Sequence, residues 1–266
     1  MKSAKNSGKY RIKVLEKAFK ILELFDDKDK ELSATEIQNH LSYNKTSTFR
    51  IIKNLEDAGY LEKDYRTLNY KLGLKIYQLG SLAEPQAIIR RITRPFLEKL
   101  NEECHETVHL AVLHKGEALY LDKIEGKKTI RVITRIGMKL PAHCSGVGKT
   151  LLSALSEDTL GKILTEKGLE RFTDNTITEL NDLKTELDQI RKQGYAIDNE
   201  EIEEGLKCVA APLINSEGKV LAAISISAPG ERFDREFATY ITRISKTSKE
   251  ISRLLRQKAV YDLYYL

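Results

Sequence analysis

The spacing of apolar residues changes once within the first 80 positions, and this change limits the folds that the chain can adopt. In the first segment apolar residues recur at helical spacing, which predicts an amphipathic helix with the apolar residues Val14, Leu15, Ala18, Phe19, Ile21, Leu22 and Phe25. Two more helical segments follow. The segment YLEKDYRTLNYKLG then alternates apolar and polar residues around a polar turn at residues 64–67, which predicts a β-hairpin. Three helices followed by a hairpin are the order of a winged helix-turn-helix.

The second and third helices carry start and stop signals. Ser33 and Glu36 have capping-box spacing at the start of the second helix. The third, in KTSTFRIIKNLEDAGY, is predicted to begin after Asn44 and to end at Gly59. Its core face is predicted from residues at i, i+3, i+4 and i+7, which are Thr48, Ile51, Ile52 and Leu55.

The outward side of the third helix collects hydroxyl groups, cations and one aromatic ring, on Lys45, Thr46, Ser47, Phe49, Arg50 and Lys53. The amino end of a helix also carries partial positive charge. Such a face suits a DNA major groove, where Lys and Ser or Thr contact phosphates and Arg or polar residues contact base edges. A small three-helix subdomain that binds protein is the alternative.

The net charge of the chain is concentrated at one end. The protein has 266 residues and a formal net charge of +5, and residues 1–80 hold 16 Lys and Arg against 11 Asp and Glu, so the whole excess lies there. A basic segment joined to a neutral remainder indicates a nucleic-acid-binding part attached to a part with another task. A solvated basic surface without a partner has the same composition.

The segment from Leu15 through ATEIQNHLSYNKTSTFRIIKNLEDAGYL resembles the DNA-binding domain of the isocitrate lyase regulator (IclR) family of bacterial transcription factors. The similarity lies in the basic-hydroxyl start of the third helix, in Arg50 with its two following aliphatic residues, and in the Gly-aromatic-Leu exit. Thr48 departs from the aliphatic residue usual on the core face, and Phe49 departs at the next outward position. Because an exposed Phe can contact a thymine methyl group, base preference is not carried over from the family.

A domain boundary is predicted near residue 84, where the charge excess ends. Helical periodicity after Gly73 is interrupted at Pro85 and Pro95, and a proline can open a helix but disrupts its interior. We predict a linker helix over 74–83 and a first helix of the next domain that ends near Glu103. The predicted domains are a winged helix-turn-helix at 10–73, a linker helix at 74–84 and a second domain at 85–266.

The segment CHETVHLAVLH contains His105, Glu106 and His109 in the order H-E-x-x-H, which on a helix would suit a zinc protease. The surrounding residues favour a strand instead, and LHKGEALYLDKI is predicted to return beside it through a turn at 115–116. Positions four apart in a strand are separated by roughly 13 Å, too far for one metal ion. No metal site is predicted.

The segment PAHCSGVGKT ends like a nucleotide-binding P-loop, G-x-x-x-x-G-K-[ST]. The first glycine of that motif would fall at position 143, which is His143. The strand–helix alternation typical of P-loop folds is also missing. Triphosphate binding is therefore not predicted, but a helix that begins near Ser145 offers free amides to an anion, and a small carboxylate remains the hypothesis.

The remainder of the chain is predicted to contain strands in IRVITRIG, in YAIDNEEIEEGLKCVAAPLI and in KVLAAISISAPG. A helix between the first two is predicted to be capped by Thr178 and ended by Gly194. Ser225 and Ser227 lie two apart and face the same side of their strand, which suits either a polar pocket or locally satisfied hydroxyls. A final helix is predicted to pack on the sheet through Phe237, Ile241, Ile244, Ile251 and Leu254.

Three of these stretches, HCSGVGKTLLSAL, RKQGYAIDNEE...GLKCVAAPL and AAISISAP, resemble the effector-binding domain of the same family, in matching order. The resemblance implies an α+β protein in which a GAF-like antiparallel sheet with helices holds a pocket for a small metabolite. It places Leu140, Gly146 and Val147 at the border of that pocket. Val147 departs from a smaller residue common in the family, and this departure bears on ligand size. The residues implied to line the pocket are Asp198, Leu206, Cys208, Ser225 and Ser227.

The sequence thus predicts a transcriptional regulator that binds a pseudo-palindromic DNA operator as a homodimer or tetramer and responds to a small organic acid. No cofactor, catalytic residue, membrane span or secretory signal is predicted, and the three widely spaced cysteines fit the cytoplasm. One alternative is a DNA-binding protein whose second domain only dimerises. The other is an enzyme with Cys144 or Cys208 as nucleophile beside His143, for which the sequence supplies no orienting third group.

Overall fold

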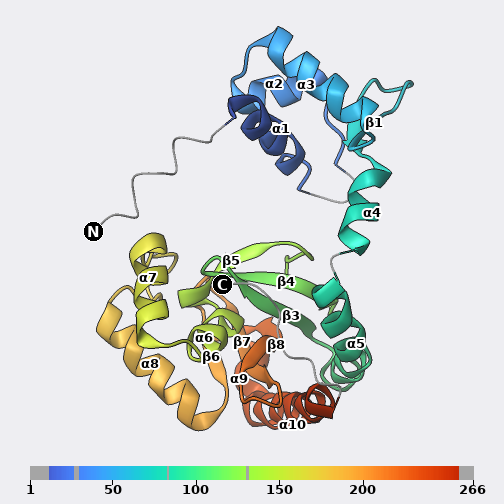
Figure 1. The fold of residues 1–266 in the computed structure, drawn as a ribbon. Helices are drawn as coiled ribbons and strands as arrows, with labels where there is room; N and C mark the ends of the chain where they lie inside the picture. The colour runs from blue at the N-terminus through green and yellow to red at the C-terminus, as the bar shows by residue number, and fades with distance from the viewer. Residues whose placement is uncertain (1–11, 27–29, 83, 130–131, 258–266) are drawn as a thin grey trace. The chain divides into compact units, whose positions relative to one another are not determined.

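The computed structural model describes residues 12–26, 30–82, 84–129 and 132–257. The chain divides into two compact units, residues 1–84 and residues 85–266, and each is described by itself. Figure 1 shows that the first unit consists mainly of helices and that the second is built around a sheet.

The first unit has the predicted order of three helices and a hairpin, followed by one more helix. Its core is formed by Ile21, Ile37, Ile52 and Leu61, each at most 1% exposed. The hairpin strands pair antiparallel, and a bridge from Leu32 adds a third segment at the hairpin. The elements are α1 (Lys13–Glu23), α2 (Ala34–Leu41), α3 (Lys45–Asp57), β1 (Leu61–Lys63), β2 (Tyr70–Leu72) and α4 (Leu74–Ser81).

The helix starts in this unit follow the predicted capping. The Ser33 side chain accepts from the Glu36 amide and the Glu36 carboxylate accepts from the Ser33 amide, which completes the capping box. The chain leaves α3 through Gly59, whose φ of +79° favours glycine.

The apolar face predicted for α1 is only partly buried. Ile21 and Phe25 enter the core, whereas Val14, Leu15 and Phe19 are 53%, 48% and 57% exposed. The predicted helix is present, but its contacts with α2 and α3 bury only part of its apolar face. A second apolar surface is left open on α4 and at the residue after it, where Leu74, Tyr77 and Leu82 are 67%, 73% and 74% exposed.

The second unit is built on an antiparallel sheet of six strands in the order β5-β4-β3-β8-β7-β6. Each strand pairs antiparallel with its neighbour, and the long central strands are β3, β8 and β7. Their bounds are β3 (Thr107–His114), β4 (Glu117–Ile124), β5 (Lys139–Pro141), β6 (Ala196–Asn199), β7 (Leu206–Ile214) and β8 (Val220–Pro229).

Helices cover both faces of this sheet (Figure 1). Val108, Leu110 and Val112 of β3 point to one face, where they pack with α5 and α10, and the alternate residues Ala111 and Leu113 point to the other, where they pack with α6, α7 and α8. The face covered by α6 is the one that holds the polar cavity described below. The helices are α5 (Glu84–Cys104), a short 3-10 turn (Ala142–Cys144), α6 (Gly146–Leu152), α7 (Glu157–Lys167), α8 (Leu180–Gln193), α9 (Gly230–Arg235) and α10 (Phe237–Gln257).

Two strand predictions were wrong. Residues 132–137 of IRVITRIG form no strand, and residues 130–131 lie outside the described residues; the edge strand beside β4 is β5. The long stretch from Tyr195 contains two strands, β6 and β7, because a turn that ends at Gly205, with φ of +77°, reverses the chain between them.

Several helix boundaries also differ from the prediction. Helix α5 continues through Pro95, which is exposed, as is Arg91 one turn earlier, so the carbonyl that loses its amide partner lies on the side facing solvent. Helix α4 ends at Ser81, and Ala83 lies outside the described residues. Helix α8 begins at Leu180 after Glu179, and the hydroxyl of Thr178 accepts a hydrogen bond from Arg171 instead of capping the helix.

The predicted final helix is split into α9 and α10. Ile244 and Ile251 are buried as predicted and Ile241 and Leu254 are partly buried, whereas Phe237 is 41% exposed. Tyr240, Ser248, Ser252 and Leu255 are also buried on α10. None of the helices within the described ranges is long and apolar enough to cross a membrane.

Candidate functional site

Helix α3 presents the predicted DNA-contacting residues along one exposed stripe. Its first amides are capped by Asn44, whose side-chain oxygen accepts from the amides of Thr46 at 3.0 Å and Ser47 at 3.4 Å. Thr48 is buried on the opposite face and its hydroxyl donates to the Asn44 carbonyl at 3.0 Å. The threonine at this core position is therefore satisfied locally.

The stripe itself is largely open. Lys45, Thr46, Phe49, Arg50 and Lys53 are exposed and Ser47 is half-buried, with Phe49 at 55% exposure. Their spacing at i, i+1, i+4, i+5 and i+8 keeps them on one side of the helix. Lys53 differs from the others because its ammonium lies 3.2 Å from Glu56 and 3.0 Å from Asp57 on the same helix.

All eight residues that the sequence assigned to the effector pocket line a single cavity of about 20 Å³. They come from β5, the start of α6, β6, β7 and β8, which the sheet and α6 bring together. Among the residues that the structure describes, five more line the cavity, namely Tyr120, Val132, Thr134, Ser145 and Ile202.

Strand register brings the polar groups of the cavity together. Cys208 of β7 lies opposite Ser227 of β8 and opposite Asp198 of β6, and its thiol donates to the Ser227 hydroxyl at 3.0 Å. Gly146, the first residue of α6, lies against these strands, since a Cβ added there would approach the Cβ atoms of Cys208 at 3.6 Å and Asp198 at 3.7 Å. The first amides of α6 have no acceptor within the helix.

Asp198 is a buried carboxyl group in this wall. It is 1% exposed, and one oxygen accepts from the Glu201 amide at 2.9 Å. Burial raises the pKa of Asp198 to about 7, although the bond from the Glu201 amide works in the opposite direction. The carboxyl is therefore protonated in a large part of the molecules at neutral pH and can then donate a hydrogen bond.

The segment GVGKT has a packing role. A Cβ on Gly148 would lie 2.4 Å from both the Cα and the carbonyl oxygen of Ala142, so only glycine fits at that point. Lys149 is 1% exposed, and its ammonium is 2.5 Å from Glu201 and 3.0 Å from Glu186. Burial opposes the charge of Lys149, but the two carboxylates outweigh it and hold the pKa of the ammonium above its ordinary value. The lysine is committed to ion pairs.

The three residues of the H-E-x-x-H pattern have different structural roles. Glu106 is 2% exposed and accepts from Arg232 at 2.8 and 2.9 Å and from Lys128 at 2.6 Å. Burial would raise the pKa of Glu106, but these cations lower it below the ordinary value. His105 precedes β3 in a left-handed conformation, with φ of 59°, whereas His109 lies within the strand. Within the described ranges no three His, Cys, Asp or Glu side chains are grouped as a metal would require.

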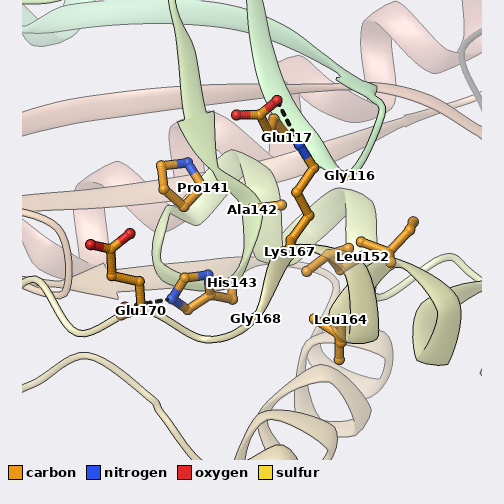
Figure 2. A pocket seen from close by; sticks show the side chains of 11 residues that line it. Gly116, Glu117, Pro141, Ala142, His143, Leu152, Leu164, Lys167, Gly168 and Glu170 are labelled. Atoms are coloured by element: carbon orange, nitrogen blue, oxygen red, sulfur yellow. Dashed lines mark hydrogen bonds and ion pairs between the residues drawn. The ribbon is translucent and has the colours of Figure 1, made fainter. Parts of the chain in front are cut away.

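His143 and Cys144, the pair considered for a nucleophile, point to different partners. Figure 2 shows the His143 ring hydrogen-bonded through Nε2 to the Glu170 carbonyl, at 3.0 Å, at the edge of a second cavity of about 140 Å³. The Cys144 thiol faces the Pro141 carbonyl at 3.8 Å, and burial raises the pKa of that thiol to about 12. Burial also raises the pKa of the Cys208 thiol.

The sequence did not indicate a role in the cavity for Thr134, which lines it, or for His109, which lies behind it. Thr134 lies in the segment that was predicted as a strand, and His109 was considered only as a zinc ligand. The His109 ring lies behind the cavity and contacts Ser225, Ser227 and Thr134. Alternation along β3 could have indicated this, because His109 and Ala111 share the face that packs toward α6.

Known proteins match both units of the chain. The IclR helix-turn-helix domain matches residues 14–65, and the C-terminal domain of the bacterial transcriptional regulator IclR matches residues 84–253. The chain is 34% identical over 245 residues to the HTH-type transcriptional regulator XynR of Escherichia coli (strain K12), a match that covers 92% of this chain and 97% of that protein.

Solved structures share the fold over nearly the same length. The Thermotoga maritima IclR structure has a TM-score of 0.75 at 33% identity, covering 91% of this chain and 98% of that one. An IclR homolog from Microbacterium hydrocarbonoxydans, complexed with 4-hydroxybenzoate, has a TM-score of 0.81 at 24% identity and covers 92% of this chain and 99% of that one. The two domain matches follow each other in chain order and each coincides with one structural unit. The chain therefore belongs to the IclR family of bacterial transcriptional regulators.

Proposed function

We propose that this regulator binds a small carboxylate-bearing metabolite in the cavity beneath α6 and that the metabolite modulates binding of α3 to DNA. The observation that carries the proposal is the convergence of Asp198, Cys208, Ser225, Ser227 and the first amides of α6 on one cavity. The serine hydroxyls, the first amides of α6 and the protonated form of Asp198 are hydrogen-bond donors, and an anion requires donors.

The size of the cavity supports a small ligand. About 20 Å³ is close to the space occupied by one water molecule. A metabolite of a few heavy atoms therefore fits only if part of the wall moves outward, and a large ligand would require rebuilding of the core. Val147, which is buried at this wall, narrows the same space.

The exposed stripe of α3 is proposed to enter the DNA major groove. Lys45, Thr46 and Ser47 supply donors for phosphates, Arg50 suits a guanine edge, and Phe49 suits a thymine methyl group. The basic character of residues 1–80 supports this assignment.

A homo-oligomer, either a dimer or a tetramer, is part of the proposal. Two apolar surfaces of the first unit are open in the single chain, Val14, Leu15 and Phe19 on α1 and Leu74 and Tyr77 on α4. A second copy that covers them would pair two α3 helices for a pseudo-palindromic operator. The metabolite would then favour one arrangement of the paired chains, because a ligand shifts an equilibrium toward the state it binds more tightly. DNA as the target makes the cytoplasm the proposed location.

No catalytic activity is proposed. Both candidate nucleophiles, Cys144 and Cys208, have thiol pKa values raised by burial, which keeps them protonated, and His143 donates to a backbone carbonyl.

The proposal is tested with the full chain in two measurements. Fluorescence anisotropy with DNA from upstream of its own gene should show binding that weakens by about 10³-fold or more between about 50 and 200 mM salt, as phosphate contacts release counterions. A thermal-shift screen of two- to four-carbon keto and hydroxy acids should find an acid that stabilises the second unit and changes the DNA affinity. Binding that ignores salt would contradict the DNA assignment. A screen without any stabilising acid would instead favour a second domain that only dimerises.

A further inference from the structure

His109 connects two walls of the proposed effector cavity. Its Nδ1 lies 3.3 Å from the Ser225 hydroxyl and 3.4 Å from the Ser227 hydroxyl, both on β8. Its Nε2 lies 2.7 Å from the hydroxyl of Thr134, on the irregular segment 132–135. The ring is 1% exposed, and these three hydroxyls are its hydrogen-bond partners among the described residues.

The sheet holds the ring in this position. His109 lies directly opposite Ser225 in the register of β3 and β8, and Thr107 lies opposite Ser227. The face of the imidazole packs on Tyr120 of β4 with 4.6 Å between the ring centroids. Because both neighbouring strands fix the ring, its two nitrogens keep their separate partners.

The imidazole is neutral under physiological conditions. Burial, helped by the nearby Lys123 ammonium, lowers the pKa of His109 to about 3. A neutral imidazole has one N–H donor and one bare nitrogen that accepts, so only two arrangements of the proton exist.

The two tautomers give the serine pair opposite properties. With the proton on Nε2, the ring donates to Thr134 and Nδ1 accepts a serine hydroxyl proton, which turns that proton away from the cavity. With the proton on Nδ1, the ring donates to the serine oxygens, and both hydroxyl protons are free for a ligand. The Cys208 thiol already donates to Ser227 at 3.0 Å, so the proton of that hydroxyl must point elsewhere.

Thr134 belongs to a wall segment held largely by side chains. The Lys123 ammonium donates to the carbonyls of Val132 at 3.1 Å and Thr134 at 2.6 Å. His109 supplies the bond to the Thr134 side chain. When the proton moves from Nε2 to Nδ1, the Thr134 hydroxyl must change from acceptor to donor. The tautomer of His109 therefore couples the orientation of the serine hydroxyls to that of the Thr134 hydroxyl.

We propose that His109 is a positioning residue that selects a carboxylate over the matching neutral amide, because its Nδ1–H tautomer frees both serine hydroxyl protons for a ligand that only accepts hydrogen bonds. A primary amide also brings donors and gains less from that tautomer. This inference rests on the proposed function, since it concerns the ligand of the same cavity.

The test combines nitrogen NMR of the imidazoles with binding of an acid and its amide. The probe is glycolate with glycolamide as the control, or the smallest acid that stabilises the wild type, with its own amide, if glycolate does not. The chain has five histidines, so the His109 signals of ¹⁵N-histidine-labelled protein are assigned from the His109→Asn variant. Saturation with the acid should move the ¹⁵N chemical shift of Nδ1 to the range of a protonated nitrogen and that of Nε2 to the range of an unprotonated nitrogen. Saturation with the amide should leave both shifts unchanged.

Affinity measurements separate a positioning role from a purely structural one. His109→Asn should weaken acid binding about tenfold, the value of one ordinary hydrogen bond, and change amide binding less than about twofold. In a Ser225→Ala/Ser227→Ala background the same substitution should have no further effect, because His109 acts through these hydroxyls. His40→Asn, an exposed histidine in the first unit, is the control for histidine loss.

The failures are distinguishable. Equal losses for acid and amide, a His109→Asn effect that persists without the serines, or an unchanged imidazole spectrum at saturation would overturn the role of His109 and leave the effector pocket standing. A wild-type protein that binds no acid at all would overturn both the pocket and this inference.

Discussion

The two units of this chain place their functional polar residues in opposite environments. On α3 five of the six proposed DNA-contacting side chains are exposed, and all six lie within nine residues of a single helix. In the second unit five of the eight proposed ligand-binding residues are buried and three are half-buried, and they come from strands and a helix start up to 87 positions apart, between Leu140 and Ser227.

In the first unit the residues proposed for DNA recognition contribute little to stability. In the second unit the residues proposed for ligand recognition also contribute to stability. An exposed side chain on α3 can be changed with little effect on folding, because it has few buried partners to lose. A buried polar group below α6 is satisfied by other buried groups, and its removal leaves them without partners. Substitutions of the exposed α3 side chains should therefore weaken DNA binding alone. Substitutions of the buried polar groups below α6 should reduce both the stability of the second unit and its ligand binding.

The largest effect is expected from Lys149→Ala. The substitution leaves Glu201 buried without its partner at 2.5 Å, which should lower the free energy of unfolding of the second unit by about 3–5 kcal/mol. Hydrogen exchange measured by mass spectrometry reports the two units separately, and protection in residues 12–82 should not change. Lys162→Ala, an exposed lysine on α7, is the control and should change stability by less than about 0.5 kcal/mol.

A double substitution shows whether the loss of stability in Lys149→Ala comes from the unpaired charge of Glu201. Replacing Lys149 and Glu201 together by apolar residues should be less costly than replacing Lys149 alone. If the double variant is the less stable one, packing and not charge pairing explains the role of Lys149.

Arg50→Ala should have the next largest effect, and on binding alone. Loss of a base-edge contact should weaken operator binding about 5- to 150-fold and relax base preference at one position. The melting temperature should stay within about 1 °C, since Arg50 is exposed. The comparison variant is Arg253→Ala on α10, an exposed arginine of the other unit, and anisotropy titrations measure both. Equal losses of affinity in the two variants would mean that general charge, and not α3, is being measured.

The pH dependence of ligand binding tests the buried cavity. Below about pH 7 Asp198 is protonated and donates to a bound carboxylate, and above it an ionised Asp198 repels that ligand. Affinity for an acid should fall about tenfold per pH unit above the pKa of Asp198. Calorimetry at about pH 6 and about pH 8.5 checks this, and Asp198→Asn, which keeps the acceptor for the Glu201 amide, should remove the dependence.

The same carboxyl also affects the stability of the free protein. Its folded pKa lies above the unfolded value of 3.8, so the folded state binds the extra proton between these values. The stabilisation is complete below about pH 4 and is lost as the pH rises through about 7. A stability difference between wild type and Asp198→Asn that stays constant over this range would contradict the assignment.

The sequence predicted the first unit better than the second because its signals are local. Capping by Ser33 and Asn44 and the burial of Ile51 and Ile52 follow from residues three or four positions apart, and the structure has these features. Leu15 lies on the predicted apolar face of α1 and is nevertheless 48% exposed, because periodicity identifies an apolar face without identifying what covers it.

In the second unit the resemblance to a family implied eight residues that do line the cavity, and local patterns alone could not bring these together. The role of His109 was not predicted, because the H-E-x-x-H pattern considers only residues near one another in the sequence. The position of His109 depends on its partner on the neighbouring strand, Ser225. Thr134 was assigned to a strand because β-branched residues around it favour one. The edge of the sheet beside β4 is occupied by β5 instead, so the Thr134 segment is irregular. Register and edge position are set by long-range pairing, which one sequence does not display.

The smallest effect is expected from a pair of lysines on α3 that differ only in their partners. Lys45 lies in the first turn and is exposed, whereas the Lys53 ammonium lies within 3.2 Å of both Glu56 and Asp57. These carboxylates raise the pKa of Lys53 and offset its charge toward a phosphate. Lys45→Ala should therefore reduce the salt dependence of DNA binding by about one counterion, while Lys53→Ala should change it by clearly less than one. Anisotropy titrations over a series of salt concentrations give both slopes. If Lys53→Ala reduces the slope as much as Lys45→Ala does, the Lys53 side chain leaves its helix partners for the DNA, and exposure alone decides which residues of the stripe bind.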